Sequence, residues 1–426
     1  MNRNLLLLLI IFTIKIGATT ITELFDAIKK QPITKIDELS RKMGELGVKK
    51  VNSNYYPKID IFGTYTHYNS STNLIPLDPL EAGKLSNEHK SLPFANTIEK
   101  VGVIVNIPIY VRELGDLSNK AIHLARSAKL KKRLNILKNE ALILGSDASL
   151  EYLEKLLTAM QKTKSSLGST RNILKIGVDS GRVAGIALDK LDQKLNELDI
   201  AINNVEIKKA KVISQIDSLT NIELEYSAPL NIKKEVQKGD ILALKPLQEL
   251  ILASQYELKA TEAKRYYPKV GFNIMWSENY AQNDVARDKS IREGYGYYQL
   301  GVSMPIYDKS ADSDIEIQKV KILKDKMRLS KTEQELKTEA KELFKELRLL
   351  MKSWQLAQKN ISKGQKLLDY AKVAFEQGSM TQEDYLRYED TLLDAKVKKY
   401  QVISQKWQTI GKLSVIYGND LKEIVE

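Results

Sequence analysis

Four stretches of the chain alternate between apolar and other side chains, as half-buried β-strands do. The clearest are residues 270–276 and 300–306, in which every second residue is apolar. Residues 101–107 alternate in the same way, and residues 59–68 do so more weakly. A period of two places the apolar side chains on one face of a sheet. The strands predicted around these stretches are each about ten residues long, the length with which a tilted strand crosses a bilayer.

Two interpretations of these strands are open, namely two hairpins over a soluble core or a sheet in a membrane. The membrane is favoured because no separate amphipathic element is left to cover the hairpins. An aromatic girdle is also expected near strand ends, and four tyrosines are candidates for it: Tyr280, Tyr295, Tyr297 and Tyr298. Four strands cannot enclose a lumen, and an open edge in lipid leaves backbone groups unpaired. Strands that span a membrane would therefore need a barrel shared between subunits.

Two other regions predict helices too long for a compact domain. Within residues 336–375, apolar and small residues recur at alternating spacings of four and three, the 3.5-residue period of a left-handed coiled coil. Residues 143–178 carry the same stripe, interrupted by Lys164 and Arg171. A helix over residues 116–177 would be about 90 Å long at about 1.5 Å per residue. The stripe alone also fits a dimeric coiled coil or an elongated bundle, but strands and helices together favour a tube that crosses a periplasm.

The two halves of the chain repeat each other. A Tyr-Tyr-Pro-Lys sequence precedes the strands in each half, and a Pro-Ile-Tyr sequence follows them. The signature positions are Pro57, Pro108 and Gly181 in the first copy, and Pro268, Pro305, Gly378 and Thr381 in the second. The separation from proline to glycine is the same in both copies. We therefore predict a first repeat at residues 19–222, a linker at 223–240 and a second repeat at 241–426, each repeat with a helix, two strands and a long helical hairpin.

The first eighteen residues predict a secretory signal peptide. Arg3 precedes an apolar run at residues 5–14, and Gly17-Ala18 offers a small-residue cleavage site. A core helix is the alternative, whereas a spanning helix is disfavoured because the run is short. The chain has no cysteine, which excludes disulfides, thiolate metal sites and lipid attachment at a cysteine.

Candidate chemistry is sparse in the rest of the sequence. His67, His89 and His123 are the only histidines, and we interpret them as surface or lumen residues rather than metal ligands. The net charge of +12 is spread over helices that also carry acids, so no nucleic-acid partner is expected. No phosphate-binding glycine loop, nucleophile elbow or metal-spaced cluster indicates an enzyme, and no cofactor is expected.

Taken together, these features resemble the TolC family of outer-membrane efflux proteins. The resemblance covers essentially all of the mature chain and rests on the duplicated strand starts, the duplicated strand ends, the long helices and the sequence that begins at Gly378. It implies a mainly helical protein with a transmembrane β part. Three copies would form a 12-stranded β-barrel in the outer membrane, continuous with a 12-helix coiled-coil α-barrel in the periplasm.

The resemblance also implies a function and partners. The chain would be the channel subunit of a tripartite efflux or type I secretion system, a passive export conduit that meets outer-membrane lipid. A periplasmic adaptor (membrane fusion) protein and an inner-membrane pump would complete the system. The alternative is a periplasmic coiled-coil adaptor or structural protein without its own channel. Adaptors, however, usually have one hairpin flanked by compact β domains.

In the family, acidic side chains after the second glycine narrow the periplasmic entrance. By position, the first acid falls on Asp384, with Glu383 beside it, whereas the second falls on Arg387, which departs from the pattern. An Asp384–Arg387 pair could close the entrance, since residues three apart on a helix are neighbours. Thr381 and Asp384 also read as a capping box that begins the returning helix. Both roles are open and they are compatible.

Overall fold

The computed structural model describes residues 19–90, 92–282 and 290–426, so the predicted signal peptide lies outside the described residues. The chain forms two compact units, each assembled from several stretches. The first contains residues 19–39, 130–245 and 331–426, and the second contains residues 40–129 and 246–330.

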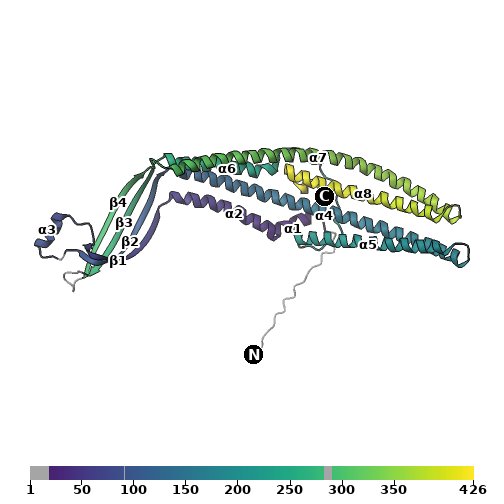
Figure 1. Cartoon of the computed structure of the whole chain (residues 1–426), viewed down its shortest axis with the longest axis horizontal. Coiled ribbons are helices and arrows are strands. Elements are labelled where there is room, and N and C mark those ends of the chain that lie inside the picture. The colour runs from purple at the N-terminus through teal and green to yellow at the C-terminus, as the bar shows by residue number, and fades with distance from the viewer. Residues whose placement is uncertain (1–18, 91, 283–289) are drawn as a thin grey trace, which may run out of the picture. The chain divides into compact units, whose positions relative to one another are not determined.

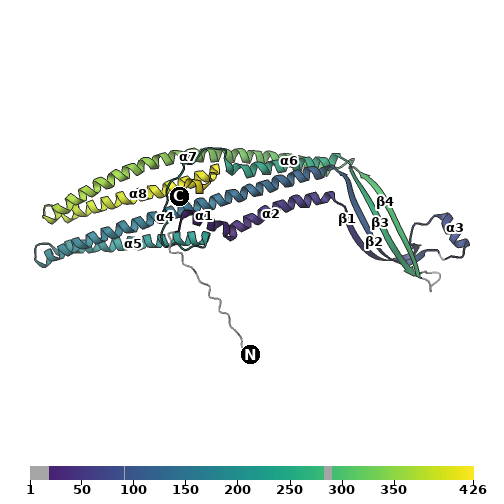
Figure 2. The same ribbon diagram turned by 180° about the vertical axis from the view of Figure 1, so that it is seen from behind.

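Helices make up most of the described chain (Figures 1 and 2). The α-helices are α1 (Ile21–Lys30), α2 (Pro32–Asn52), α3 (Pro79–Asn87), α4 (Arg112–Asp179), α5 (Gly185–Thr220), α6 (Lys245–Tyr266), α7 (Lys309–Glu376), α8 (Gln382–Tyr417) and α9 (Leu421–Ile424), with short 3-10 turns at η1 (Ser53–Tyr55) and η2 (Leu242–Leu244). None of these described helices is long and apolar enough to cross a membrane.

The second unit contains one four-stranded antiparallel sheet (Figure 1). Its strands are β1 (Lys58–Asn73), β2 (Phe94–Val111), β3 (Lys269–Gln282) and β4 (Ser290–Ser303), in the order β1-β2-β3-β4. The two predicted hairpins are thus joined through β2 and β3, and β1 and β4 are the edges. At 14 to 18 residues, the strands are longer than the predicted ten.

The two strands that end near a proline end differently. β4 stops at Ser303, so the predicted continuation to Ile306 is wrong. Pro305 has no N–H to donate to a ladder, and such a residue favours the end of a strand. β2 instead continues past Pro108, with an irregularity in its pairing to β3 between Pro108 and Tyr110. A bulge is one of the few places where a sheet accepts proline.

Two helical hairpins form most of the first unit. α4 and α7 each have 68 residues, and the returning helices α5 and α8 each have 36. In both hairpins the glycine of the repeat signature makes the turn: Gly181 and Gly378 both have a φ of +72°. Glycine adopts this left-handed conformation without the strain that a Cβ would add.

The predicted heptad stripes face the interior of the first unit. Leu167 and Leu174 of α4 are buried, as are Ala340, Leu343 and Leu350 of α7. Trp354 departs from the stripe, since 38% of its surface is exposed.

The two basic residues that interrupt the stripe of α4 have partners on α5. Lys164 lies 2.5 Å from a carboxylate oxygen of Asp199. The Arg171 guanidinium binds both carboxylate oxygens of Asp192, with Nη2–Oδ2 at 2.9 Å. These ion pairs join the two helices of the hairpin.

A separate cluster fixes the ends of the chain against α4. Ile21, Leu24, Phe25 and Ile28 of α1 are buried in it together with Ile143 of α4. Thr20 and Glu23 form a capping box at the start of α1. The predicted linker, residues 223–240, joins the same cluster and pairs with the C-terminal segment through an antiparallel bridge between Ile232 and Val425.

Candidate channel surfaces and entrance

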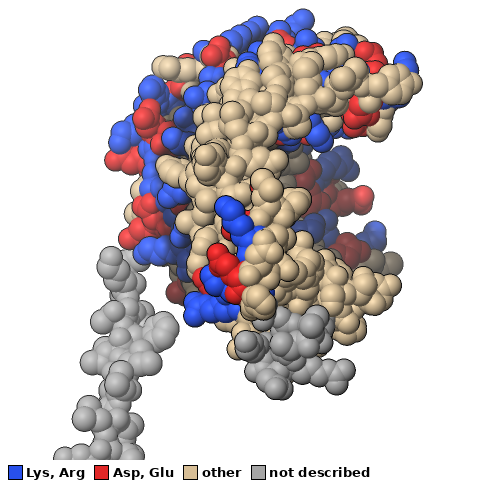
Figure 3. Space-filling view, turned by 90° about the vertical axis from the view of Figure 1, so that its left-hand side faces the viewer, with Lys and Arg blue, Asp and Glu red and all other residues tan. Residues whose placement is uncertain are grey.

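One face of the sheet is apolar along a continuous band. The register brings Ile59, Val105, Ile274 and Tyr298 into one row across all four strands. The next row contains Ile61, Val103 and Trp276. Many of these side chains are exposed, with Ile61 at 81% and Trp276 at 52%. Uncharged residues dominate the front of Figure 3, which looks from the side where the strands lie in Figure 1.

The apolar band has a defined end away from the helices. Glu278 and Arg292 lie on this face and form an ion pair, with Nε–Oε2 at 2.8 Å. The distance from Val270 to Glu278 is about 26 Å along the strand, at about 3.3 Å per residue. A tilt of about 40° reduces it to about 20 Å, somewhat less than the apolar band of an outer-membrane barrel, about 25 Å.

Tyrosines lie at the other end of the band, where the strands meet the helices. Those listed here flank the strand ends and have between 42% and 79% of their surface exposed: Tyr55, Tyr56, Tyr110, Tyr266, Tyr267 and Tyr307. Of the four tyrosines expected to form a girdle, only Tyr280 lies near a strand end. Tyr295, Tyr297 and Tyr298 lie in the middle of β4. Tyr295 and Tyr297 also point to the opposite face, because they share their register with Ser277 and Met275.

The opposite face of the sheet is polar in the part nearest the helices. Lys58, Asn106, Asn273 and Gln299 form a row across all four strands. The Asn273 side-chain amide donates to Asn106 Oδ1 at 2.6 Å. An apolar face backed by a polar one is the arrangement that a lipid-embedded wall around water requires.

The predicted entrance residues lie together at the start of α8, beside the Gly378 turn. The Thr381 hydroxyl accepts the backbone N–H of Asp384 at 3.2 Å and donates to Asp384 Oδ2 at 2.7 Å. Thr381 is therefore the N-cap of α8. Arg387 lies 3.7 Å from Asp384 as a solvent-exposed ion pair, and Glu383 is exposed beside them. Surface pairs of this kind contribute about 0–1 kcal/mol, so the pair has little effect on stability.

The sequence did not reveal a second set of contacts near this turn. Glu389 is buried and accepts hydrogen bonds from the hydroxyls of Ser166 on α4 (2.5 Å) and Tyr385 (2.9 Å). Asp390 binds Lys194 of α5 at 3.0 Å. These contacts hold α8 against both helices of the other hairpin. The only indication of these contacts in the sequence was the separation of Tyr385 and Glu389 by four residues.

Two of the three histidines take part in pairwise side-chain contacts. His123 Nδ1 lies 2.7 Å from Glu249 Oε2, and its ring stacks on Tyr256. His67 Nδ1 lies 2.8 Å from the Thr97 hydroxyl. Among residues 19–90, 92–282 and 290–426, no group of three or more potential ligands is arranged to hold a metal ion.

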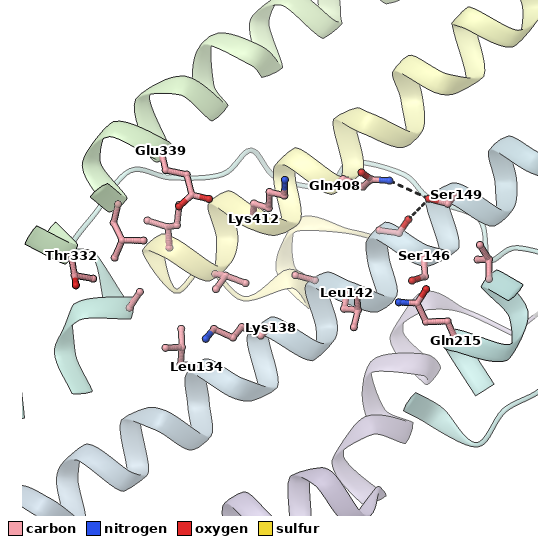
Figure 4. Close-up of a pocket in the computed structure, with 17 residues that line it drawn as sticks. Leu134, Lys138, Leu142, Ser146, Ser149, Gln215, Thr332, Glu339, Gln408 and Lys412 are labelled. Atoms are coloured by element: carbon pink, nitrogen blue, oxygen red, sulfur yellow. Dashed lines mark hydrogen bonds between the residues drawn. The ribbon is translucent and has the colours of Figure 1, made fainter. Parts of the chain in front are cut away.

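A groove of about 740 Å³ lies in the first unit between α4, α7 and α8 (Figure 4). Its walls are largely aliphatic, and Lys138, Lys412 and Glu339 stand around it. The Gln408 amide donates to the Ser149 hydroxyl at 3.1 Å.

Two buried carboxylic acids of α4 face the chain ends and the linker. Asp147 Oδ1 accepts the backbone N–H of Ala228 at 2.9 Å, and the side chain is fully buried. Burial raises the pKa of Asp147 to about 7, against the lowering effect of that hydrogen bond. Burial also raises the pKa of Glu140 to about 7. These acids were not singled out in the sequence, because a single acid on a helix does not show which face is covered.

No protein-family model and no curated protein matches the chain. Solved structures do match it. The Campylobacter jejuni CmeC outer membrane channel is 14% identical, with a TM-score of 0.77, over 93% of this chain and 85% of that one. The Vibrio cholerae outer membrane protein VceC is 10% identical, with a TM-score of 0.78, over 93% and 96%. The Neisseria gonorrhoeae MtrE outer membrane channel in its open state is 12% identical, with a TM-score of 0.72, over 93% and 88%.

The chain thus has the fold of outer-membrane channel proteins. This confirms the TolC-like fold predicted from the duplicated strands and long helices. The similarity extends over nearly the whole chain, and the whole mainly helical architecture with its antiparallel sheet is shared.

Proposed function

We propose that this protein is an outer-membrane channel subunit of the TolC family and serves as a passive export conduit across the outer membrane and periplasm. The observation that carries the proposal is the four-stranded sheet with an apolar face, a polar face and two open edges. In hydrocarbon, each unpaired backbone group at an edge costs several kcal/mol. β1 of one copy pairing with β4 of the next removes this cost.

The proposed assembly is a homotrimer with twelve strands and a periplasmic helical tunnel. Three copies of the sheet would give a closed barrel. Interior side chains alone fill a barrel of eight strands, so a barrel of twelve strands is wide enough to leave a lumen. The rows headed by Ile59 and Ile61 would face lipid, and the row that contains Asn106 would face water. Residues 19–222 and 241–426 would be the two structural repeats, joined by residues 223–240. A periplasmic adaptor and an inner-membrane pump would complete a tripartite efflux or type I secretion system.

The proposal is tested by purifying the protein from membranes and reconstituting it in planar bilayers. We expect an outer-membrane trimer that produces discrete ion currents. A trimer without conductance, or a chain present only in the soluble periplasmic fraction, would contradict the channel proposal. The soluble result would favour the alternative, a periplasmic coiled-coil protein.

We also propose that Asp384 contributes to the electrostatics of the periplasmic entrance, with Glu383 and Arg387 beside it. Support comes from its position directly after the Gly378 turn and from its exposure to solvent. Asp384→Ala should change cation selectivity or open probability. Thr381→Ala is the matched control, since it removes the cap but keeps every charge, and caps of this type contribute about 1 kcal/mol. Unchanged currents in Asp384→Ala would leave this residue a capping role alone.

A further inference from the structure

The proposed barrel wall does not account for two tyrosines of β4. Tyr295 and Tyr297 lie in the middle of the strand and share their register with Ser277 and Met275 of β3. They are on the same face as Gln299, because residues two apart in a strand point to the same side. In the proposed channel this is the face directed to water. The two tyrosine rings are in contact, with centroids 6.1 Å apart and an angle of 49° between the planes.

A third ring lies on the same face, at the other edge of the sheet. Phe62 of β1 pairs with Gly102 of β2. Gly102 pairs with Ser277, and Ser277 pairs with Tyr295, so these residues form one row across the sheet. A Cβ atom at Gly102 would lie 2.8 Å from two carbons of the Phe62 ring, so the ring lies over the glycine. The row thus has aromatic rings on the two edge strands and small residues on the two central strands.

The two tyrosine rings of β4 are accessible from the proposed pore. Tyr297 is 38% exposed, and Tyr295 is half-buried. β4 is an edge strand (Figure 1), so pairing with β1 of the next copy would use its backbone edge and leave its two faces as they are. Adjoining exposed apolar groups on a surface that faces water often mark a site for a ligand. The two rings are therefore candidates for contact with cargo.

One carboxylate accompanies the two rings. Glu293 lies two residues before Tyr295 on the same face of β4, about 6.6 Å along the strand at about 3.3 Å per residue. It is the one charged residue that the described strand β4 directs to this face, because Arg292 points to the other face and pairs there with Glu278. Lys100 of β2 is in the same row as Glu293 but two strands away, and these two described residues form no ion pair. The carboxylate is thus available to a positively charged ligand.

We propose that Glu293, Tyr295 and Tyr297 form a binding site for aromatic organic cations on the inner wall of the barrel. The inference rests on the proposed channel function, because that function makes this face the pore lining. The negative face of a tyrosine ring attracts a cation, and a planar ligand also stacks on it. Glu293 adds charge complementarity. A trimer would carry three such sites, each beside a seam between subunits, and they would give the conduit a preference for one class of cargo.

Block of the ion current by ethidium, a planar aromatic cation, tests the site in reconstituted channels. Ethidium should block the wild-type protein. The double variant Tyr295→Ser/Tyr297→Ser should raise the half-blocking concentration by about tenfold or more, since each ring removed takes away a stacking contact. Tyr295→Phe/Tyr297→Phe keeps both rings and should be blocked like the wild-type protein. Tyr298→Ser is the matched control, because it removes the same side chain from β4 on the apolar face.

Glu293→Gln separates the charge from the ring stacking. It should raise the half-blocking concentration of ethidium by about two- to fivefold, the effect of an exposed ion pair. Block by phenanthridine, which has the same planar ring system without the charge, should not change. This variant also decides the matter if the double serine variant fails to assemble. Unchanged ethidium block in an assembled Glu293→Gln channel would then overturn the proposed site.

Binding of ethidium to the detergent-purified protein, followed by its fluorescence, does not depend on conductance and separates the two proposals. If the wild-type protein conducts but ethidium neither binds nor blocks, or blocks the double serine variant equally well, the cation site is overturned and the channel stands. If the wild-type trimer does not conduct, the channel proposal fails, and the fluorescence titration decides the site. Equal ethidium affinity in the wild-type protein and the double serine variant overturns it, and an affinity about tenfold lower in the variant supports it.

Discussion

Asp147→Asn is the perturbation for which the structure makes the sharpest prediction. The carboxyl group is fully buried on α4, and its Oδ1 accepts the N–H of Ala228 in the linker. Oδ2 has no hydrogen-bond partner in the described part of the chain. Burial is the main cause of the raised pKa, and the nearby carboxylates of Glu151 and Glu154 raise it further. Asparagine keeps an acceptor for Ala228 but cannot ionise.

The magnitude follows from the pKa of Asp147 in the two states. Folding raises this pKa from an ordinary value of 3.8 to about 7. Below pH 4 the carboxyl is protonated in both states. As the pH rises from 4 to 7, Asp147 releases its proton when the linker is detached and retains it when the linker is attached. Attachment therefore weakens with pH up to 7 and is constant above it. At 1.36 kcal/mol per pH unit, the loss is at most about 4 kcal/mol.

Hydrogen exchange at the Ala228 amide measures this attachment locally, since exchange there requires the linker to open. In the wild-type protein, the protection factor should fall between pH 4 and pH 7 and stay constant above it. Asp147→Asn should remove a large part of that fall, and Glu140 accounts for a remainder because its pKa is also raised to about 7. Asp179→Asn, at the exposed end of α4, is the control. Equal pH dependence in the wild-type protein and Asp147→Asn would refute the reasoning.

Three further predictions concern the sheet and the turn. In Gly102→Ala, the added Cβ would lie 2.4 Å from the carbonyl oxygen of Trp276, so trimer yield should drop sharply on gels, whereas Gly301→Ala, with 4.0 Å to the nearest atom, should be tolerated. Trp276→Lys places a charge on the apolar face and should cost about 2–4 kcal/mol of folding free energy in lipid vesicles, and Gln299→Lys on the polar face should cost little. Gly378→Ala should cost about 1 kcal/mol in thermal unfolding because of its φ of +72°.

The entrance shows how far sequence reasoning can go at one site. Local features could be predicted, since Thr381, Asp384 and Arg387 lie within the first two turns of α8, and the structure brings them into contact. The bonds from Ser166 and Lys194 to α8 were not readable. They join residues far apart in the chain, and a heptad pattern gives the face of a helix but not its axial register against another helix.

The sequence alone determined the elements and their order, because alternation, heptads, prolines and glycines act within a few residues of themselves. It therefore predicted the strands, the long helices and the turns at Gly181 and Gly378, and from them the TolC-like fold. Only the tertiary structure decided what covers each face. Ile98 is buried beside Leu74, and Asp147 is buried beside the linker. Both contacts join segments that are distant in the sequence, and burial by a distant segment leaves no periodic trace. The same limit applied to Tyr295 and Tyr297. As tyrosines expected near strand ends they suggested a girdle, but the register places them on the face opposite the apolar band.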